Sequence, residues 1–249
     1  MIQPRATKIG APLFLIPSRI DQAELLDQGE GSLADVRTNL QEMSRINRAF
    51  AGVRSITSHL KPEAHPDARP LRIVDLGTGS GQLAHHLVHD WARENNVQVQ
   101  VYPVDLSPRN LSVARETVTS DPAIHLIQAN GLAPPFAADC IDYYISSLFM
   151  HHFSPELLIE LLRTVYQLAR RGIIMSDIVR GYLPLAAFRL VQPVFARHFM
   201  TRHDGTVSIR RAYTPRELQQ LARAAGLETA CIHSYFPWRM TLVAEKPYV

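Results

Sequence analysis

Residues 72–81 read Arg72-Ile73-Val74-Asp75-Leu76-Gly77-Thr78-Gly79-Ser80-Gly81, and the segment Gln82-Leu-Ala-His-His-Leu follows them. The first half is typical of a buried strand, and the three glycines are typical of a tight turn into a helix. Glycine is needed where the backbone takes a positive φ or must lie against a ligand, because a Cβ would collide there. The free N–H groups and the positive dipole end of the following helix point into the same space. This turn is therefore predicted to hold a nucleotide-like ligand.

The spacing of the glycines discriminates between nucleotide ligands. The dinucleotide fingerprint is G-x-G-x-x-G with an acidic residue roughly 20 positions later. Here the glycines fall as G-x-G-x-G, and Asp75 stands two residues ahead of the first. Asp105 ends the next alternating apolar run, at residues 97–105. Its carboxylate is expected beside the glycine turn, where it can accept two hydrogen bonds from the vicinal diol of a ribose. The glycine spacing disfavours a nicotinamide oxidoreductase.

Four motifs in order over residues 71–153 resemble those of the class I S-adenosylmethionine-dependent methyltransferases. They are Val74–Gly81, Val104-Asp105-Leu106-Ser107-Pro108, Gln128-Ala129-Asn130-Gly131, and the segment from Cys140 to Phe153. The details also look like the branch that modifies quinones and polyketides. The resemblance implies that S-adenosylmethionine is the cofactor. The implied binding residues are Asp75, Gly77, Thr78, Gly79, Gly81, Asp105, Leu106, Asn130, Gly131 and Leu148. The family often has Asp where this chain has Asn130, so the adenine contact there would be a neutral amide.

The order of the predicted elements indicates the fold class. Strands are predicted at 71–76, 97–105, 123–128, 139–148 and 171–178, and helices at 80–95, 108–119 and 155–170. Such alternation predicts a doubly wound, mostly parallel α/β sheet. A helix at 215–225 and an antiparallel hairpin, 227–235 with 239–246, are expected to close the chain, as in this family. The sheet would then have seven strands in a Rossmann-like methyltransferase fold.

Two segments outside this alternation are predicted to form a lid over the ligand. Residues 1–70 would form an N-terminal helical cap and linker, with helices at 20–28 and 33–60. Residues 180–213 would form a basic helical lid inserted into the cofactor-binding domain, 71–249. Residues 180–216 contain seven arginines against the single acidic residue Asp204. Arg210 and Arg211 are the predicted contacts for an anionic or carrier-bound acceptor; a solvated surface is the other interpretation of the segment.

His151 and His152 are the candidate catalytic residues. They follow the fourth predicted strand at its carboxyl end, where ligands bind in open α/β sheets. An imidazole could take the proton from a phenol or a carboxylic acid as the methyl group arrives. His152 is the better candidate, and bracing of the loop is the alternative role. Methyl transfer asks little of a base, because alignment of the reactants supplies much of the rate. His85 and His89 lie four residues apart, but no further ligand residues cluster near them, and no metal is predicted.

Composition restricts the class of protein. A chain of 249 residues with 46% apolar content suits one large α/β domain with a cap. Cys140 and Cys231 fit neither a disulfide framework nor a zinc pattern, which favours buried free thiols in a reducing cytoplasm. The N-terminal segment lacks the charged-then-apolar order of a secretion signal, and no apolar run approaches the ~20 residues that cross a bilayer. A cytoplasmic monomer or homodimer without a membrane partner is expected.

The predicted function is methyl transfer to a small, largely apolar acceptor of aromatic, phenolic or polyketide-like type. Oxygen is preferred as the acceptor atom, with carbon methylation of an electron-rich ring as the alternative. A nucleic-acid acceptor is disfavoured because the fourth strand ends in Ser-Ser-Leu-Phe-Met rather than in an Asn-Pro-Pro-Tyr type of sequence. Aromatic residues are also poorly interleaved with the arginines. A non-catalytic protein that binds S-adenosylmethionine as a partner or sensor is the alternative from another class.

Overall fold

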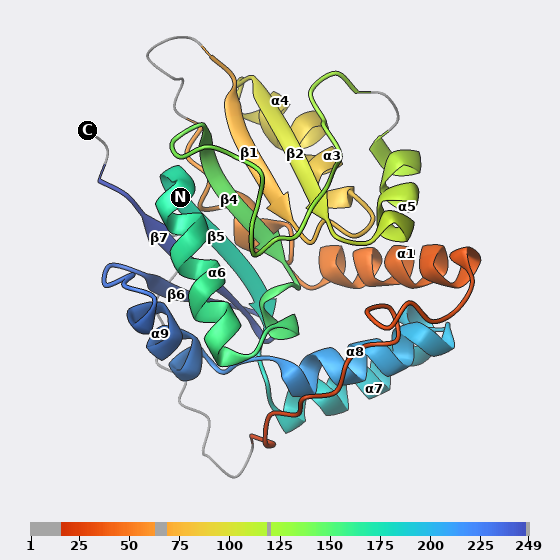
Figure 1. Ribbon diagram of the computed structural model, residues 1–249. Coiled ribbons are helices and arrows are strands. Elements are labelled where there is room, and N and C mark those ends of the chain that lie inside the picture. Colours follow the sequence, from red (N-terminus) through yellow and green to blue (C-terminus); the bar gives the residue numbers. More distant parts are fainter. Residues whose placement is uncertain (1–15, 63–68, 119–120, 248–249) are drawn as a thin grey trace.

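The computed structural model describes residues 16–62, 69–118 and 121–247 (Figure 1). Residues 1–15 and 63–68 of the predicted cap and linker therefore lie outside the described residues. The centre is a seven-stranded sheet in the order β3-β2-β1-β4-β5-β7-β6. The strands are β1 (Leu71–Leu76), β2 (Val99–Asp105), β3 (Ile127–Gln128), β4 (Ile141–Ser147), β5 (Ala169–Ile178), β6 (Cys231–Tyr235) and β7 (Arg239–Glu245). The first five strands run parallel, and β7 runs antiparallel to both β5 and β6. The predicted mostly parallel α/β fold is confirmed.

Helices cover both faces of the sheet because its strands are apolar on both sides. On one face lie α6 (Pro155–Leu168) and α9 (Pro215–Ala224), whose Leu158, Leu162 and Leu218 are fully buried. The other face is covered by α2 (Arg54–Thr57), α3 (Gln82–His86), the π-helical turn Leu87–Trp91, α4 (Ala92–Glu94) and α5 (Pro108–Val118). Side chains buried on both faces are the expected environment of a parallel sheet.

Three of the described helices, α1, α6 and α9, begin at residues whose side chains accept from free backbone N–H groups. Ser32 caps α1 (Leu33–Ala49) in a reciprocal pair with Asp35, and Thr214 caps α9 in the same way with Glu217. The hydroxyl of Ser154 accepts from the backbone of Leu157, so α6 starts where the sequence predicts it.

Three predicted elements are wrong in extent or in kind. Residues 20–28 form no helix: residues 20–24 have no regular structure and residues 25–28 lie in turns. The backbone N–H groups of Leu25 and Leu26 bond to the Asp204 carboxylate and not to backbone carbonyls. The predicted helix 33–60 ends at Ala49, since Ala51 takes a left-handed φ of 61° that α-helix cannot continue. Strand β3 has two residues where six were predicted.

The cap and the insertion meet at the carboxyl ends of the parallel strands. Figure 1 shows α1 beside α7 (Tyr182–Phe195) and α8 (Phe199–Arg211), beyond the tips of the strand arrows. We call residues 16–32 the strap; they run along the same edge. α1 packs against both α7 and α8, so segments far apart in sequence enclose one space. None of the helices in the described ranges is long and apolar enough to cross a membrane.

Candidate active site

A cavity of about 560 Å³ lies at this edge of the sheet. Its floor is the glycine loop and the ends of β1, β2 and β4, and its roof is the strap, α1 and α8. The volume is within the range of small-molecule sites. Of the predicted site residues, those that line it are Asp75, Gly77, Thr78, Gly79, Asp105, Leu106, Asn130, Gly131, Leu148, His151 and His152.

The glycine loop needs glycine for a measurable steric reason. Gly77 has φ of 66°, and a Cβ at this position would stand 2.3 Å from the ring of Phe149. A Cβ on Gly131 would lie 3.0 Å from the same ring. Phe149 therefore packs across two glycine-containing turns and holds them together. Gly81 does not line the cavity; it has φ of 74° and precedes the first residue of α3.

Two buried carboxyl groups flank this loop. Asp105, at the end of β2, accepts from the backbone N–H of Gly79 at 3.0 Å and of Ser107 at 2.9 Å. Asp105 also accepts from the side-chain amide of Asn110 at 3.2 Å. A carboxylate has about four acceptor positions, so about one remains for a ribose hydroxyl. Asp75, at the end of β1, accepts from the Thr78 hydroxyl at 2.6 Å. Thr78 is one of the predicted cofactor-binding residues, and its hydroxyl proton is directed to Asp75.

The pKa values of the two carboxyl groups are shifted in the same direction. Burial raises the pKa of Asp75 to about 7, against the opposing hydrogen bond from Thr78, and the neighbouring Asp105 adds to the rise. Burial also raises the pKa of Asp105, although three hydrogen bonds oppose the shift. This end of the cavity is therefore poised to accept a cationic group, because a nearby positive charge would recover the desolvation cost.

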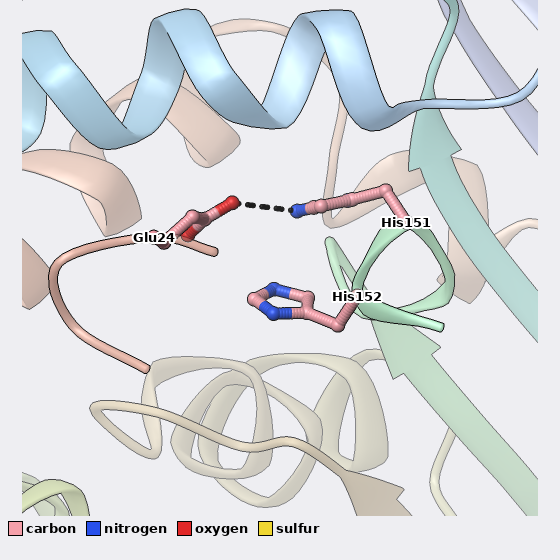
Figure 2. Close-up of side chains that lie close together, drawn as sticks. All are labelled: Glu24, His151 and His152. Carbon is pink, nitrogen blue, oxygen red and sulfur yellow. Dashed lines mark hydrogen bonds and ion pairs between the residues drawn. The ribbon is translucent and has the colours of Figure 1, made fainter. Parts of the chain in front are cut away.

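His151 is a buried ion-pair clamp (Figure 2). Its Nδ1 lies 2.9 Å from the Asp177 carboxylate at the end of β5, and its Nε2 lies 3.2 Å from Glu24 of the strap. Burial alone would lower the pKa of His151, but these two carboxylates outweigh burial and raise the pKa to about 10. Both ring nitrogens of His151 face carboxylates, so neither is free to take a proton from an acceptor. Of its two predicted roles, the geometry supports bracing.

His152 differs from its neighbour in exposure and in partners. Its Nδ1 lies 2.8 Å from Asp27 of the strap, and its side chain is 21% exposed. An Nδ1–H that donates to Asp27 leaves the Nε2 lone pair for a ligand, which is the arrangement of an oriented general base. Figure 2 shows the His152 ring lying below the Glu24–His151 pair. The structure thus places the better of the two predicted bases in the cavity.

Glu24, His151 and His152 also satisfy the distance criterion for a metal site. Their candidate ligand atoms all lie within 4.8 Å of one another. Both nitrogens of His151 already contact carboxylates, and Glu24 also accepts from the Ser208 hydroxyl at 2.5 Å. Protons therefore satisfy this cluster without a cation, as expected for an ion-paired clamp.

Arg210 and Arg211 do not line the cavity, contrary to their predicted role as acceptor contacts. Arg211 is 6% exposed and donates to the backbone carbonyl of His152 at 2.6 Å. Arg210 accepts at its own carbonyl from the backbone N–H of Ile20. Other arginines of the 180–213 insertion also donate to main-chain carbonyls, and the sequence pattern does not show these bonds; they are Arg180, Arg197 and Arg202.

The strap residues are the part of the site that the sequence analysis missed. Glu24 and Asp27 lie three residues apart in a segment predicted as a helix. The spacing offered a signal for a shared acidic face, but their histidine partners are more than 120 residues away. The cysteine prediction was half right. Cys140 and Cys231 are free, yet neither is buried.

Comparison with known proteins agrees with this architecture. Residues 73–172 match the family model described as "Methyltransferase domain". The structure is similar to SibL, an S-adenosylmethionine-dependent methyltransferase, with 21% identity and a TM-score of 0.56 over 83% of this chain and 57% of SibL. It is similar to human N-acetylserotonin methyltransferase, with 16% identity and a TM-score of 0.63 over 92% and 61% of the two chains. It is also similar to PigF with S-adenosylhomocysteine, with 15% identity and a TM-score of 0.62 over 91% of this chain and 63% of PigF.

The chain spans less than two thirds of the length of each of these three proteins. No curated protein matches it by sequence. The matched family model covers the glycine loop, Asp105 and both histidines, which lie in the motifs that carry the resemblance. Residues 73–172 therefore match a methyltransferase domain, whose cofactor is S-adenosylmethionine, and the chain has the Rossmann-like fold of the class I S-adenosylmethionine-dependent methyltransferases.

Proposed function

We propose that this protein transfers a methyl group from S-adenosylmethionine to a hydroxyl oxygen of a small, uncharged, largely apolar acceptor, such as a phenol. The observation that carries the proposal is the His152–Asp27 pair, 2.8 Å apart, in the same cavity as the glycine loop. Oriented bases of this kind accelerate proton transfer from hydroxyl groups.

The residues present fit the cofactor. Gly77 and Gly79 take positive φ values in a loop that faces the cavity, and Asp105 has unused acceptor capacity for the ribose. When bound, S-adenosylmethionine supplies a methyl group activated by the sulfonium sulfur, so the S–C bond breaks as the bond to the acceptor oxygen forms. His152 orients the acceptor hydroxyl and receives its proton at Nε2, while Asp27 stabilises the imidazolium that results.

The charge of the cavity supports an uncharged acceptor over an anionic one. Five carboxyl groups line it, and within the described residues no Lys or Arg side chain does so; the five are Glu24, Asp27, Asp75, Asp105 and Asp204. A carboxylate or phosphate acceptor would be repelled there.

Methyl transfer to a panel of phenols, aryl carboxylates and electron-rich arenes tests the proposal. Product mass and the position of the label from methyl-labelled cofactor distinguish oxygen from carbon methylation. We expect methyl ethers of phenols and little ester formation. Carbon-methylated products, or tight binding of S-adenosylhomocysteine with no transfer to any compound, would contradict the proposal.

We also propose that Asp75 receives the ammonium of the cofactor's methionine tail. Because burial raises the pKa of Asp75 to about 7, the free protein carries a neutral carboxyl group below that pH. The ammonium favours the carboxylate, so binding below pH 7 must expel a proton. We expect the affinity for S-adenosylhomocysteine to fall by up to about tenfold per pH unit as pH drops below 7.

Calorimetry at pH 6, 7 and 8 checks this. The Asp75→Asn variant should bind weakly with no pH dependence between these values. The control is Asp90→Asn, on an exposed ion pair with His86, which should retain the wild-type slope. A wild-type affinity that is constant across this range would refute the assignment.

A further inference from the structure

A second cavity, of about 110 Å³, opens beside the first. We call it the side pocket; Met43, Leu148 and Ser208 line both cavities. We propose that the side pocket binds the apolar part of the acceptor, a single aromatic ring or a short alkyl chain. The proposal rests on the proposed function for one element, the position of the reacting hydroxyl at His152.

The lining of the side pocket selects for an apolar guest. Its walls include Ile46, Phe50, Phe188, Val191 and Ile209, from α1, α7 and α8. Among the described residues, none of the buried side-chain nitrogen or oxygen atoms that lack a partner belongs to this wall. A polar guest would lose its water without gaining hydrogen bonds, whereas an apolar guest gains about 25 cal/mol per Å² of buried surface.

Two polar side chains at the edge of the side pocket, Ser208 and Arg239, already have hydrogen-bond partners. The Ser208 hydroxyl donates to Glu24. The guanidinium of Arg239 is buried and donates to Asn47 at 2.7 Å and to Ser176 at 3.4 Å. These bonds hold polar atoms away from the guest and toward the larger cavity. The arrangement points to an acceptor with a polar end near His152 and an apolar end in the side pocket.

The size of the side pocket restricts the guest. An apolar cavity of about 150 Å³ is known to bind benzene, so about 110 Å³ suits a single ring that partly protrudes, or a chain of a few carbons. Phe188 forms one wall, and its position depends on Gly205 of α8. A Cβ on Gly205 would stand 2.3 Å from the Phe188 ring, so glycine lets α7 and α8 approach closely enough to shape this wall.

Leu148 stands at the junction of the two cavities in a strained conformation. Its φ of 58° is uncommon for a residue with a branched side chain, and its N–H is held by the Ser176 carbonyl at 2.9 Å. Strain of this kind costs on the order of 1–3 kcal/mol and persists at ligand sites. Leu148, predicted as a cofactor contact, is thus also placed to contact the acceptor.

Binding to protein saturated with S-adenosylhomocysteine tests the side pocket without requiring turnover. The probes are phenol and 4-propylphenol, measured by calorimetry. Each buried methylene is worth a factor of about four, so we expect the three carbons of the propyl group to tighten binding by up to about sixtyfold. Val191→Phe, which fills the side pocket, should remove most of that gain.

Leu190→Phe is the matched control, because Leu190 is the adjacent residue of α7 and is 81% exposed. It should keep the full propyl gain. If Val191→Phe fails to fold, Phe188→Ala provides a second test. It enlarges the side pocket and should shift the preference from 4-propylphenol toward 4-hexylphenol.

A propyl gain that survives Val191→Phe, or no gain in the wild type, would overturn the side pocket. A kcat/KM for methyl transfer that does not depend on the alkyl group of the phenol would also overturn the side-pocket proposal, while leaving the proposed function intact. Tight, Val191-dependent binding of 4-propylphenol without any methyl transfer would support the side pocket and refute the proposed function.

Discussion

Replacing His151 with alanine is expected to lower the free energy of unfolding by about 3–5 kcal/mol, because removal of one partner leaves buried charges uncompensated. The charges are those of Glu24 and Asp177, whose residues are 4% and 1% exposed. Urea denaturation followed by circular dichroism at pH 6 measures the change. The strap should also become more accessible to proteases, since Glu24 is its buried anchor to the sheet.

A matched control is His86→Ala. His86 also contacts a carboxylate, Asp90 at 2.7 Å, but on the surface of the molecule. Exposed pairs contribute about 0–1 kcal/mol, so this variant should be nearly as stable as the wild type. If His151→Ala does not fold, Glu24→Gln keeps the shape of the strap and should cost about 1–3 kcal/mol. A loss below 1 kcal/mol for His151→Ala would show that the clamp does not stabilise the fold.

The clamp also predicts how stability depends on pH. The pKa of His151 is raised from 6.5 to about 10, so its contribution is complete below pH 6.5 and is lost as pH rises through 10. Burial would raise the pKa of Glu24, but His152 and His151 lower it from 4.5 to about 2. Its contribution is complete above pH 4.5 and is lost as pH falls toward 2. The stabilising effect of the clamp is therefore greatest between about pH 4.5 and 6.5.

Replacing His152 with alanine is expected to reduce kcat for phenol methylation by about 10²–10⁴, the usual contribution of a positioned base. The affinity for S-adenosylhomocysteine should change little, because the substitution leaves the glycine loop and Asp105 unchanged. Steady-state rates with labelled cofactor, together with calorimetry on the same preparations, check both statements.

Asp27→Asn separates the base from its orienting group. The amide keeps the size of the side chain but no longer stabilises an imidazolium, so kcat should fall, but by less than in His152→Ala. An acceptor with a lower hydroxyl pKa, such as 4-nitrophenol, should recover much of the loss in His152→Ala. A His152→Ala enzyme with wild-type kcat on phenol would exclude the base.

The cofactor half of the site could be predicted from sequence because its chemistry is local. A strand, a turn with glycines at Gly77 and Gly79, and an acid at the end of the next strand depend on neighbouring residues and on parallel pairing. A residue at the carboxyl end of a neighbouring parallel strand necessarily lies near the glycine loop. The stretch 72–81 therefore predicted both the fold class and the cofactor.

The acceptor half could not be predicted because its residues meet only through long-range packing. Glu24 and Asp27 lie more than 120 residues before their partners His151 and His152. The strap forms no helix because its backbone is hydrogen-bonded to the Asp204 carboxylate. The predicted acceptor contact of Arg211 depended on long-range packing for the same reason. A count of arginines does not show that the Arg211 side chain is buried and donates to the His152 carbonyl.

The sequence by itself determined the order of strands and helices, the glycine loop and the acids at the ends of β1 and β2, because these follow from backbone sterics and hydrophobic periodicity. Only the tertiary structure decided which of the two histidines in the cavity wall is buried between two carboxylates and which is partly exposed. Adjacent residues with identical side chains differ there in burial and charged neighbours, and both properties arise when the strap, β5 and α8 pack together.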